Sequence, residues 1–198
     1  MSMWKKIKQL FIPQSDDSEQ EDSELEYVTF QTKVPIDVLF TKNFVAGGGL
    51  FFYCENEQET LENLKEIIIN EQVVEAICFD DSLKSLLNRL NIKNTEEVSP
   101  TADFAFIECE YLVALDGSIM LSSHQTKGVK QMDLPNNIII FANPSQLVTN
   151  LNEAMQRLNS KKAGNIPSQI TSIRGRNPHI IEGNSSSKNL YLLLVEQF

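Results

Sequence analysis

Short apolar segments alternate with amphipathic helical patterns along most of this 198-residue chain, and this alternation constrains its fold most strongly. Residues 50–54 and 137–142 are too short for typical helices and are rich in aromatic or β-branched side chains. Between such segments, residues 57–70 repeat apolar positions every three or four residues. The sequence therefore predicts an α/β fold with three layers, a mainly parallel sheet and helices on both of its faces.

Local signals predict where most of these elements begin and end. The predicted strands are residues 27–32, 50–54, 76–79, 111–114, 118–121, 137–142, 169–173 and 190–195, and the predicted helices are residues 35–43, 57–70, 83–90 and 144–158. Asp81 or Ser82 is expected to cap the third helix. Asn143 is expected to cap the fourth, with Pro144 at its first position.

Two glycine-containing segments predict turns. Asp116-Gly117 lies between two apolar strands and predicts a type I′ hairpin turn, in which both residues have positive φ. Gly47-Gly48-Gly49 precedes a strand rather than a helix, so no helix N-terminus follows it to bind a phosphate. A loop that requires positive φ is the favoured interpretation of the triple glycine.

The chain divides into three parts by composition. Residues 1–12 place Met3, Ile7, Leu10 and Phe11 on one face of a predicted amphipathic helix. Residues 13–26 are rich in Asp and Glu and nearly free of apolar side chains, which predicts a solvated acidic linker. Residues 27–198 are expected to form one α/β domain. The N-terminal helix could dock on its own domain, on a partner or on a membrane surface.

Charge and composition exclude several classes of protein. A formal net charge of −10 argues against a general nucleic-acid binder, which needs a basic face. No apolar run approaches the roughly 20 residues that a membrane span requires, and a secretory signal is not recognised, so a cytoplasmic location is expected. The three cysteines, Cys54, Cys78 and Cys109, are far apart, so no metal site, iron–sulfur cluster or disulfide framework is predicted.

The segment from Cys109 to Leu121 resembles the signature of the LUD-domain family, whose members include lactate-utilisation protein C. That signature has Ala-Asp, a few apolar residues, and then Ala-Glu-Thr-Gly-Thr before a second strand. Glu110 stands at the position of the family's Asp, and Ala114, Gly117 and Ser118 match the rest. Leu115 stands where the family has Glu, so that family carboxylate is absent here.

The resemblance continues towards the C-terminus. Lys127 and Lys130 are followed by Leu134-Pro135 and an apolar strand, in the family's order, and residues 190–195 resemble its closing strand. The polar loops around residues 172–175 and 182–187 differ from the family pattern. The resemblance implies a NagB/RpiA/CoA-transferase-like fold and an accessory or ligand-binding role in lactate utilisation beside iron–sulfur partner proteins.

Basic side chains in two loops suggest a site for a small anion. Arg174 and Arg176 follow a predicted strand, where ligands of open α/β sheets bind. Lys127 and Lys130 lie in the loop after the hairpin, next to His124. If the two loops meet, they form a pocket that binds a carboxylate or phosphate metabolite. The alternative is that these side chains are solvated loop residues.

Other polar residues leave the chemistry open. His124 and His179 are the two histidines, and each is a candidate general base without an identified carboxylate partner. Glu110 and Ser118 either line the ligand pocket or have local structural roles. No cofactor motif is present, and a catalytic residue cannot be assigned.

Three functions remain compatible with the sequence. The first is the small-anion-binding LUD protein described above. The second is a free-standing isomerase or acyl-transferase-like enzyme that acts on a small phosphorylated or carboxylated metabolite. The third is a scaffold whose pocket has been lost. The sequence does not decide between a monomer and a homo-oligomer.

Overall fold

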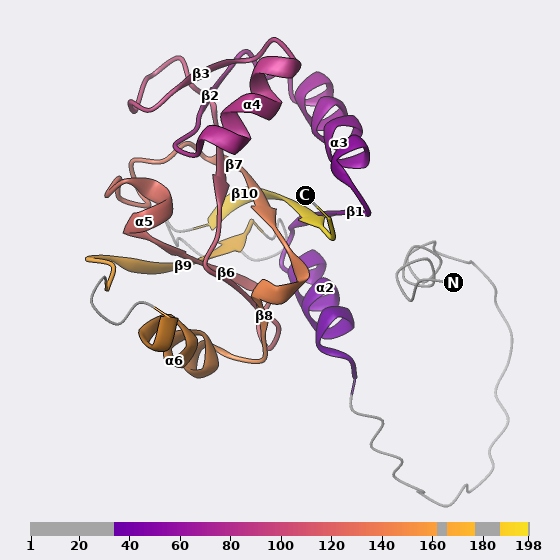
Figure 1. Cartoon of the computed structure of the whole chain (residues 1–198), viewed down its shortest axis with the longest axis vertical. Coiled ribbons are helices and arrows are strands. Elements are labelled where there is room, and N and C mark those ends of the chain that lie inside the picture. The colour runs from indigo at the N-terminus through magenta and orange to yellow at the C-terminus, as the bar shows by residue number, and fades with distance from the viewer. Residues whose placement is uncertain (1–33, 162–165, 177–186, 198) are drawn as a thin grey trace, which may run out of the picture.

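A computed structural model describes residues 34–161, 166–176 and 187–197, which contain one continuous ten-stranded sheet (Figure 1). The strands are β1 (Leu50–Cys54), β2 (Glu75–Ile77), β3 (Lys93–Thr95), β4 (Phe104–Glu108), β5 (Tyr111–Val113), β6 (Ser118–Ser122), β7 (Asn137–Ala142), β8 (Leu147–Val148), β9 (Ile170–Gly175) and β10 (Ser187–Val195). The helices are α2 (Ile36–Ala46), α3 (Glu57–Asn70), α4 (Asp81–Arg89), α5 (Ser123–Thr126), the 3-10 helix η1 (Pro144–Gln146) and α6 (Leu151–Lys161).

Six parallel strands form the larger part of the sheet, in the order β3-β2-β4-β7-β10, with β1 on the outer side of β10. Their side chains alternate between two buried faces. In β10, Leu190, Leu192 and Leu194 belong to one hydrophobic cluster, and Tyr191 and Leu193 belong to the other. This explains why the strands appear in the sequence as continuous apolar runs.

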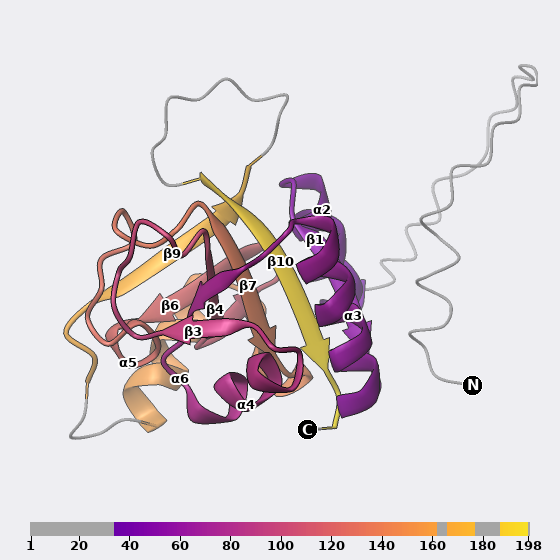
Figure 2. The same cartoon turned by 90° about the horizontal axis from the view of Figure 1, so that it is seen from above.

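Helices cover both faces of this parallel sheet. On one face α3 and α4 bury Leu64, Leu83 and Leu87 against the strands. On the other face α2 contributes Phe40 and Phe44, whose stacked rings lie with centroids 5.4 Å apart. Figure 2 shows α2 and α3 beside β1 and β10. The predicted α/β class, the mainly parallel sheet and the layered arrangement are confirmed.

The remaining strands form a smaller sheet in the order β9-β6-β5-β8, joined to the larger one where β9 pairs with the start of β10. One face of this smaller sheet shares the α2 cluster through Leu112, Ile119 and Ile173. Its other face packs on α6 through a third cluster that includes Tyr111, Met120 and Leu158. The small sheet and α2 therefore cover the same side of the parallel sheet, and α6 covers the outer face of the small sheet.

The hairpin of β5 and β6 was predicted from sequence, but its turn differs from the prediction. Among the described residues, only Gln72, Asn91 and Lys127 have positive φ apart from glycines, so Asp116 does not adopt the expected conformation. Gly117 has φ +66°, and the Asp116 carboxylate instead accepts hydrogen bonds from Ser118. The turn is held by a side chain rather than by the type I′ backbone.

Other differences concern short elements. The helix expected over residues 144–158 is wrong in its first part: Asn143 caps only η1, and residues 147–148 form β8 beside β5 before α6 begins at Leu151. Pairing with β5 overrides the helical spacing of the apolar residues there. Asp80, not Asp81 or Ser82, caps α4. Three further elements were not predicted: β3 and α5, which have three and four residues, and β4, an apolar run of the same length as β1.

The triple-glycine loop connects α2 to β1 by close backbone packing. Gly47 follows the last turn of α2, and Gly48 has φ +88°. A Cβ atom on Gly175 would lie 2.7 Å from the Gly47 carbonyl oxygen and from the Gly49 amide nitrogen. The glycines thus allow β9 to pass directly against this loop, in agreement with the predicted loop rather than a phosphate cradle.

Several sequence predictions lie outside the described residues. These are the helix of residues 1–12, the linker of residues 13–26, the strand of residues 27–32 and the candidate base His179. In the part of the chain that the structure describes, no helix is long and apolar enough to cross a membrane.

Candidate functional site

The connections of β2 and β4 diverge at their carboxyl ends, which creates the kind of crevice where open α/β sheets bind ligands. After β2, α4 leads outward to β3, whereas after β4 the chain turns back through the β5–β6 hairpin and α5 towards β7. A cavity of about 180 Å³ lies there. It is lined by Phe79, Asp80, Ile107, Glu108, His124, Gln125 and Lys127.

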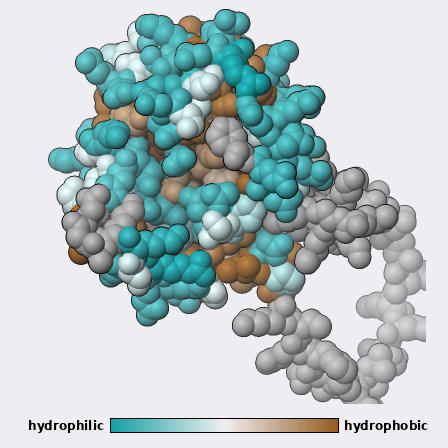
Figure 3. Space-filling model, in the orientation of Figure 1, coloured by the Kyte–Doolittle hydropathy of each residue, from teal (hydrophilic) through white to brown (hydrophobic). Residues whose placement is uncertain are grey.

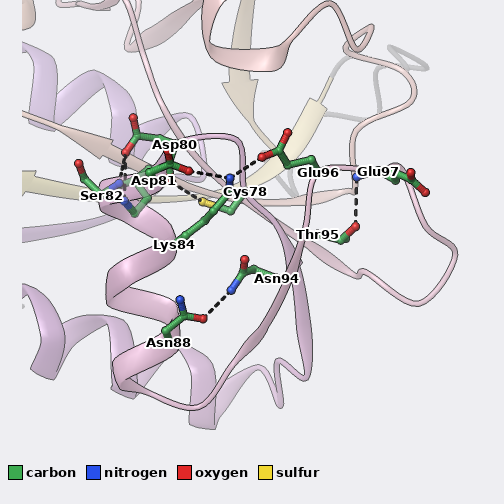
Figure 4. Close-up of polar contacts among 11 residues, drawn as sticks. Cys78, Asp80, Asp81, Ser82, Lys84, Asn88, Asn94, Thr95, Glu96 and Glu97 are labelled. Carbon is green, nitrogen blue, oxygen red and sulfur yellow. Dashed lines mark hydrogen bonds and ion pairs between the residues drawn. The ribbon is translucent and has the colours of Figure 1, made fainter.

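Asp80 is placed by the start of α4. Its Oδ1 accepts hydrogen bonds from the Ser82 and Leu83 amides at 2.8 and 3.0 Å, which satisfies two donors at the helix N-terminus (Figure 4). Next to it, Lys84 forms ion pairs with Asp81, at 2.9 Å, and with Glu96. Asp80 therefore has a fixed orientation at the cavity wall, and the neighbouring Asp81 charge is already paired.

Glu110, Ser122 and His124 form a polar chain behind the cavity. The Ser122 hydroxyl lies 2.7 Å from Glu110 Oε1 and 2.9 Å from Gln125 Oε1, and its oxygen also accepts the His124 amide. Glu110 Oε1 lies 3.7 Å from Nδ1 of His124. This separation is longer than a hydrogen bond, so the two groups are close enough to attract each other when His124 is protonated.

The local sequence explains why α5 holds these groups. Ser122 ends β6 in an extended conformation and forms a reciprocal capping box with Gln125, whose side chain accepts the Ser122 amide at 2.9 Å. Lys127 follows α5 with φ +50°. The four-residue helix thereby directs His124, Gln125 and Lys127 to one side, where all three line the cavity.

Glu108 lines the cavity with a carboxyl group whose pKa is changed by its surroundings. Partial desolvation, and then the charges of Asp80 and Glu110, raise the pKa of the Glu108 carboxyl above its ordinary value. This side chain therefore keeps its proton to a higher pH than an ordinary Glu. Cys109, between the two carboxylates, is buried, and burial raises the pKa of its thiol, so it is not an activated nucleophile.

Arg174 and Ser118 do not line the cavity; they lie at the beginning of β6, near the hairpin turn. Strand β9 runs antiparallel to β6, with Ile170 opposite Ser122 and Ile173 opposite Ile119. Arg174 is therefore near the beginning of β6, about 13 Å along the strand from its Ser122 end. The expectation that the Arg174 loop and the Lys127 loop meet is not fulfilled.

At the beginning of β6, Arg174 has a structural partner. Its guanidinium forms an ion pair with Asp116, whose other oxygen accepts the Ser118 hydroxyl at 2.7 Å and the Ser118 amide at 3.1 Å. Burial alone would raise the pKa of Asp116, but the Ser118 hydrogen bonds and the Arg174 charge lower it below its ordinary value. Ser118 and Arg174 thus stabilise the hairpin turn.

The other two predicted cations do not line the cavity. Arg176 and Lys130 are both exposed, and the Lys130 carbonyl accepts the amides of Asp133 and Leu134 in a turn. Of the residues proposed from sequence, the structure brings Lys127, His124 and Glu110 together. Sequence reasoning missed Asp80, Glu108 and Gln125. Asp80 and Glu108 could have been found from the sequence, because each directly follows an apolar segment, residues 76–79 and 104–107, where ligands of open α/β sheets bind.

Among the residues described, no three His, Cys, Asp or Glu side chains form a group suited to a metal ion. Cys54, Cys78 and Cys109 are free and buried. Burial raises the pKa of Cys78 to about 12, as expected for a thiol that acts as a core residue.

All the residues that line the cavity lie within one region that matches a known family. The family model described as the LUD domain matches residues 76–197. This chain belongs to the LUD-domain family. The resemblance noted in the sequence is confirmed, and family membership supports a function related to lactate utilisation. Within the LUD domain, Glu110 and Ser122 lie at the open end of the β5–β6 hairpin, near the cavity. Asp116 lies in the turn at the other end.

A solved structure supports the fold of this LUD domain. The crystal structure of a DUF162-family protein from Deinococcus radiodurans matches with a TM-score of 0.60 and 16% sequence identity, over 81% of this chain and 96% of that chain. The likeness at this identity concerns the fold alone. No curated protein matches the chain significantly.

Proposed function

We propose that this LUD domain serves lactate utilisation by binding a small hydroxy acid of the size of lactate in the cavity at the ends of β2 and β4. The observation that carries this proposal is the pairing of one ammonium group, Lys127, with hydrogen-bonding side chains, His124 and Glu108, around about 180 Å³ of space. Lys127 would bind the ligand carboxylate, and His124 or Glu108 would bind its hydroxyl. The space suits a metabolite much smaller than a typical drug.

The acidic side chains of the cavity influence such binding but do not prevent it. Asp80 is engaged by two α4 amides, and Glu110 by Ser122. The raised pKa of Glu108 means that this group loses its repulsive charge at a higher pH than an ordinary glutamate does. Affinity for a carboxylate should therefore increase as the pH is lowered towards the pKa of Glu108, provided that the ligand stays ionised.

Calorimetric titration with L-lactate tests the proposal, with two lysines of one loop as a matched pair. Lys127 lines the cavity and Lys130 does not. Lys127→Ala should weaken binding by roughly tenfold or more, the expected loss of a charge-assisted contact, whereas Lys130→Ala should leave it unchanged. The proposal is wrong if wild-type protein does not bind L-lactate, even when it binds inorganic phosphate, or if both variants lose the same affinity.

We also propose that the protein acts beside iron–sulfur partner proteins. The support is its membership of the LUD-domain family and the link of that family to lactate utilisation. Co-expression with the products of adjacent genes should yield a coloured complex that contains this chain. Elution of this chain apart from every such product would remove the support for a partner of that kind.

One observation favours the alternative of a free-standing enzyme of the isomerase kind. Glu110 lies 3.7 Å from Nδ1 of His124, longer than a hydrogen bond, and Ser122 donates to Glu110, so a small approach of the two groups would give an oriented general base. Such a base would exchange the proton on C2 of a bound 2-hydroxy acid with solvent. Proton NMR in D2O would detect this exchange, and His124→Gln should abolish it. Binding without exchange would favour the accessory role.

A further inference from the structure

An exposed apolar patch lies on the side of the domain opposite α3 and α4, where α2, the hairpin turn and α6 meet. It consists of Ile36, Leu115 and Leu151, whose side chains are 37%, 65% and 47% exposed. Figure 3 shows hydrophobic residues gathered at the lower part of the domain, over α2 and β8. Exposed single leucines are common on proteins, but a group of them on neighbouring elements marks an interaction surface.

Hydrogen bonds join the elements that carry these three residues. The Leu115 amide donates to the Thr149 carbonyl, two residues before Leu151. Asn43 of α2 donates through Nδ2 to the Ala114 and Leu115 carbonyls at 2.8 and 3.0 Å. Ile36 lies two turns before Asn43 on the same face of α2, which packs against β8. The patch is therefore held on a rigid part of the fold.

We propose that residues 3–12 of this same chain dock on this patch. The described chain begins at Val34, two residues before Ile36, so residues 1–33 are joined to the domain beside the patch. Residues 13–33, when extended, span up to roughly 70 Å, which is ample for residues 3–12 to return. A tethered segment reaches an effective concentration on the order of mM, so weak contacts suffice for occupancy.

The chemistry of this segment complements the patch. Met3, Ile7, Leu10 and Phe11 share one face at helical spacing, which supplies apolar side chains for Leu115 and Leu151. Lys5, Lys6 and Lys8 give the segment a positive charge, whereas residues 34–198 carry 13 Lys and Arg against 20 Asp and Glu, a formal net charge of −7. The negative electrostatic field of the domain therefore attracts the basic segment, and contact between apolar side chains stabilises the docked state. This inference does not depend on the function of the cavity.

The only tryptophan in the sequence, Trp4, lies in this segment and reports directly on docking. In full-length protein, its fluorescence should be blue-shifted and poorly quenched by acrylamide. A Leu115→Asp, Leu151→Asp double variant should shift the emission to the red and expose Trp4 to the quencher. A Val74→Asp, Met132→Asp variant is the matched control, because both side chains are exposed, at 77% and 75%, and lie on other parts of the domain. It should behave as wild type.

Each outcome is decisive when light scattering and circular dichroism are recorded on the same samples. A folded monomer whose blue shift is independent of protein concentration, and is lost only in the patch variant, supports the proposal. Red-shifted emission in the wild type, or a blue shift that survives both variants, overturns it. A blue shift that disappears on dilution together with a dimer also overturns it, because a second copy then occupies the patch.

Discussion

The turn of the β5–β6 hairpin packs so closely on α2 that a Cβ atom on Gly117 would lie 2.5 Å from the carbonyl carbon of Asn43. Gly117 also has φ +66°, so both space and backbone conformation require glycine there. This contact aligns the hairpin, and through β6 it positions α5 and the cavity residues that follow.

Two alanine substitutions separate the effect of positive φ at Gly117 from the effect of its close contact with Asn43. Gly128→Ala should destabilise the protein by about 1–2 kcal/mol, because Gly128 has φ +84° but no atom near its Cβ position. Gly117→Ala carries the same backbone strain plus the steric conflict with Asn43, so it should lose roughly 1–3 kcal/mol more. Urea denaturation of both variants measures the difference. Equal losses would mean that the hairpin moves away from α2 without penalty.

A second prediction concerns the cap of α5. Ser122→Ala removes the capping hydroxyl and its hydrogen bond to Glu110, so unfolding free energy should fall by roughly 1–2 kcal/mol. Ser160→Ala is the comparison, since this exposed serine of α6 should change stability by less than about 0.5 kcal/mol. Thermal or urea unfolding of the two variants measures this difference in unfolding free energy. If Ser122→Ala proves as mild as Ser160→Ala, α5 does not depend on the capping box.

The raised pKa of Glu108 predicts a pH-dependent effect of substitution. The folded protein binds the Glu108 proton more tightly than the unfolded chain, whose reference pKa is 4.5, so stability falls as the pH rises through the folded pKa. Glu108→Gln removes this loss. The variant should therefore gain stability over wild type at neutral pH and lose that advantage below about pH 4. A difference in unfolding free energy that is constant with pH would contradict the assignment.

Asp116 should show the opposite pH dependence. Its pKa is lowered in the folded protein, so its contribution is present at neutral pH and is lost as the pH falls through the folded value. Asp116→Asn should accordingly destabilise the protein at pH 7 and have little effect in strong acid. Denaturation curves at the two pH values give the comparison, and an effect that grows in acid would refute it.

Substitution of Arg174 should affect the hairpin turn but not ligand binding in the cavity. Its exposed ion pair with Asp116 should contribute only about 0–1 kcal/mol, so Arg174→Ala should alter unfolding slightly. Because Arg174 is at the other end of β6 from the cavity, the same change should leave calorimetric affinity for a carboxylate unchanged, in contrast to Lys127→Ala. Loss of affinity in Arg174→Ala would place the ligand at the hairpin turn instead.

The local elements were largely predictable because their signals are local. The strand at residues 50–54 and the helix at residues 57–70 were predicted with the bounds that the structure has, since apolar periodicity and flanking polar residues define both. The hairpin followed from Asp116-Gly117, and the family followed from the residues around it. By contrast, β3 consists of Lys93, Asn94 and Thr95, so no apolar pattern marks it and its pairing with β2 is a tertiary contact.

The sequence by itself determined the α/β class, the family and most of the longer elements, because periodicity and turn residues act over a few positions. Only the tertiary structure decided which basic residues share a site. The antiparallel register of β6 and β9 separates Arg174 from Lys127, and the diverging connections of β2 and β4 bring Asp80 and Glu108 to His124. These relationships depend on which strands pair, and pairing is set by packing between residues far apart in the chain.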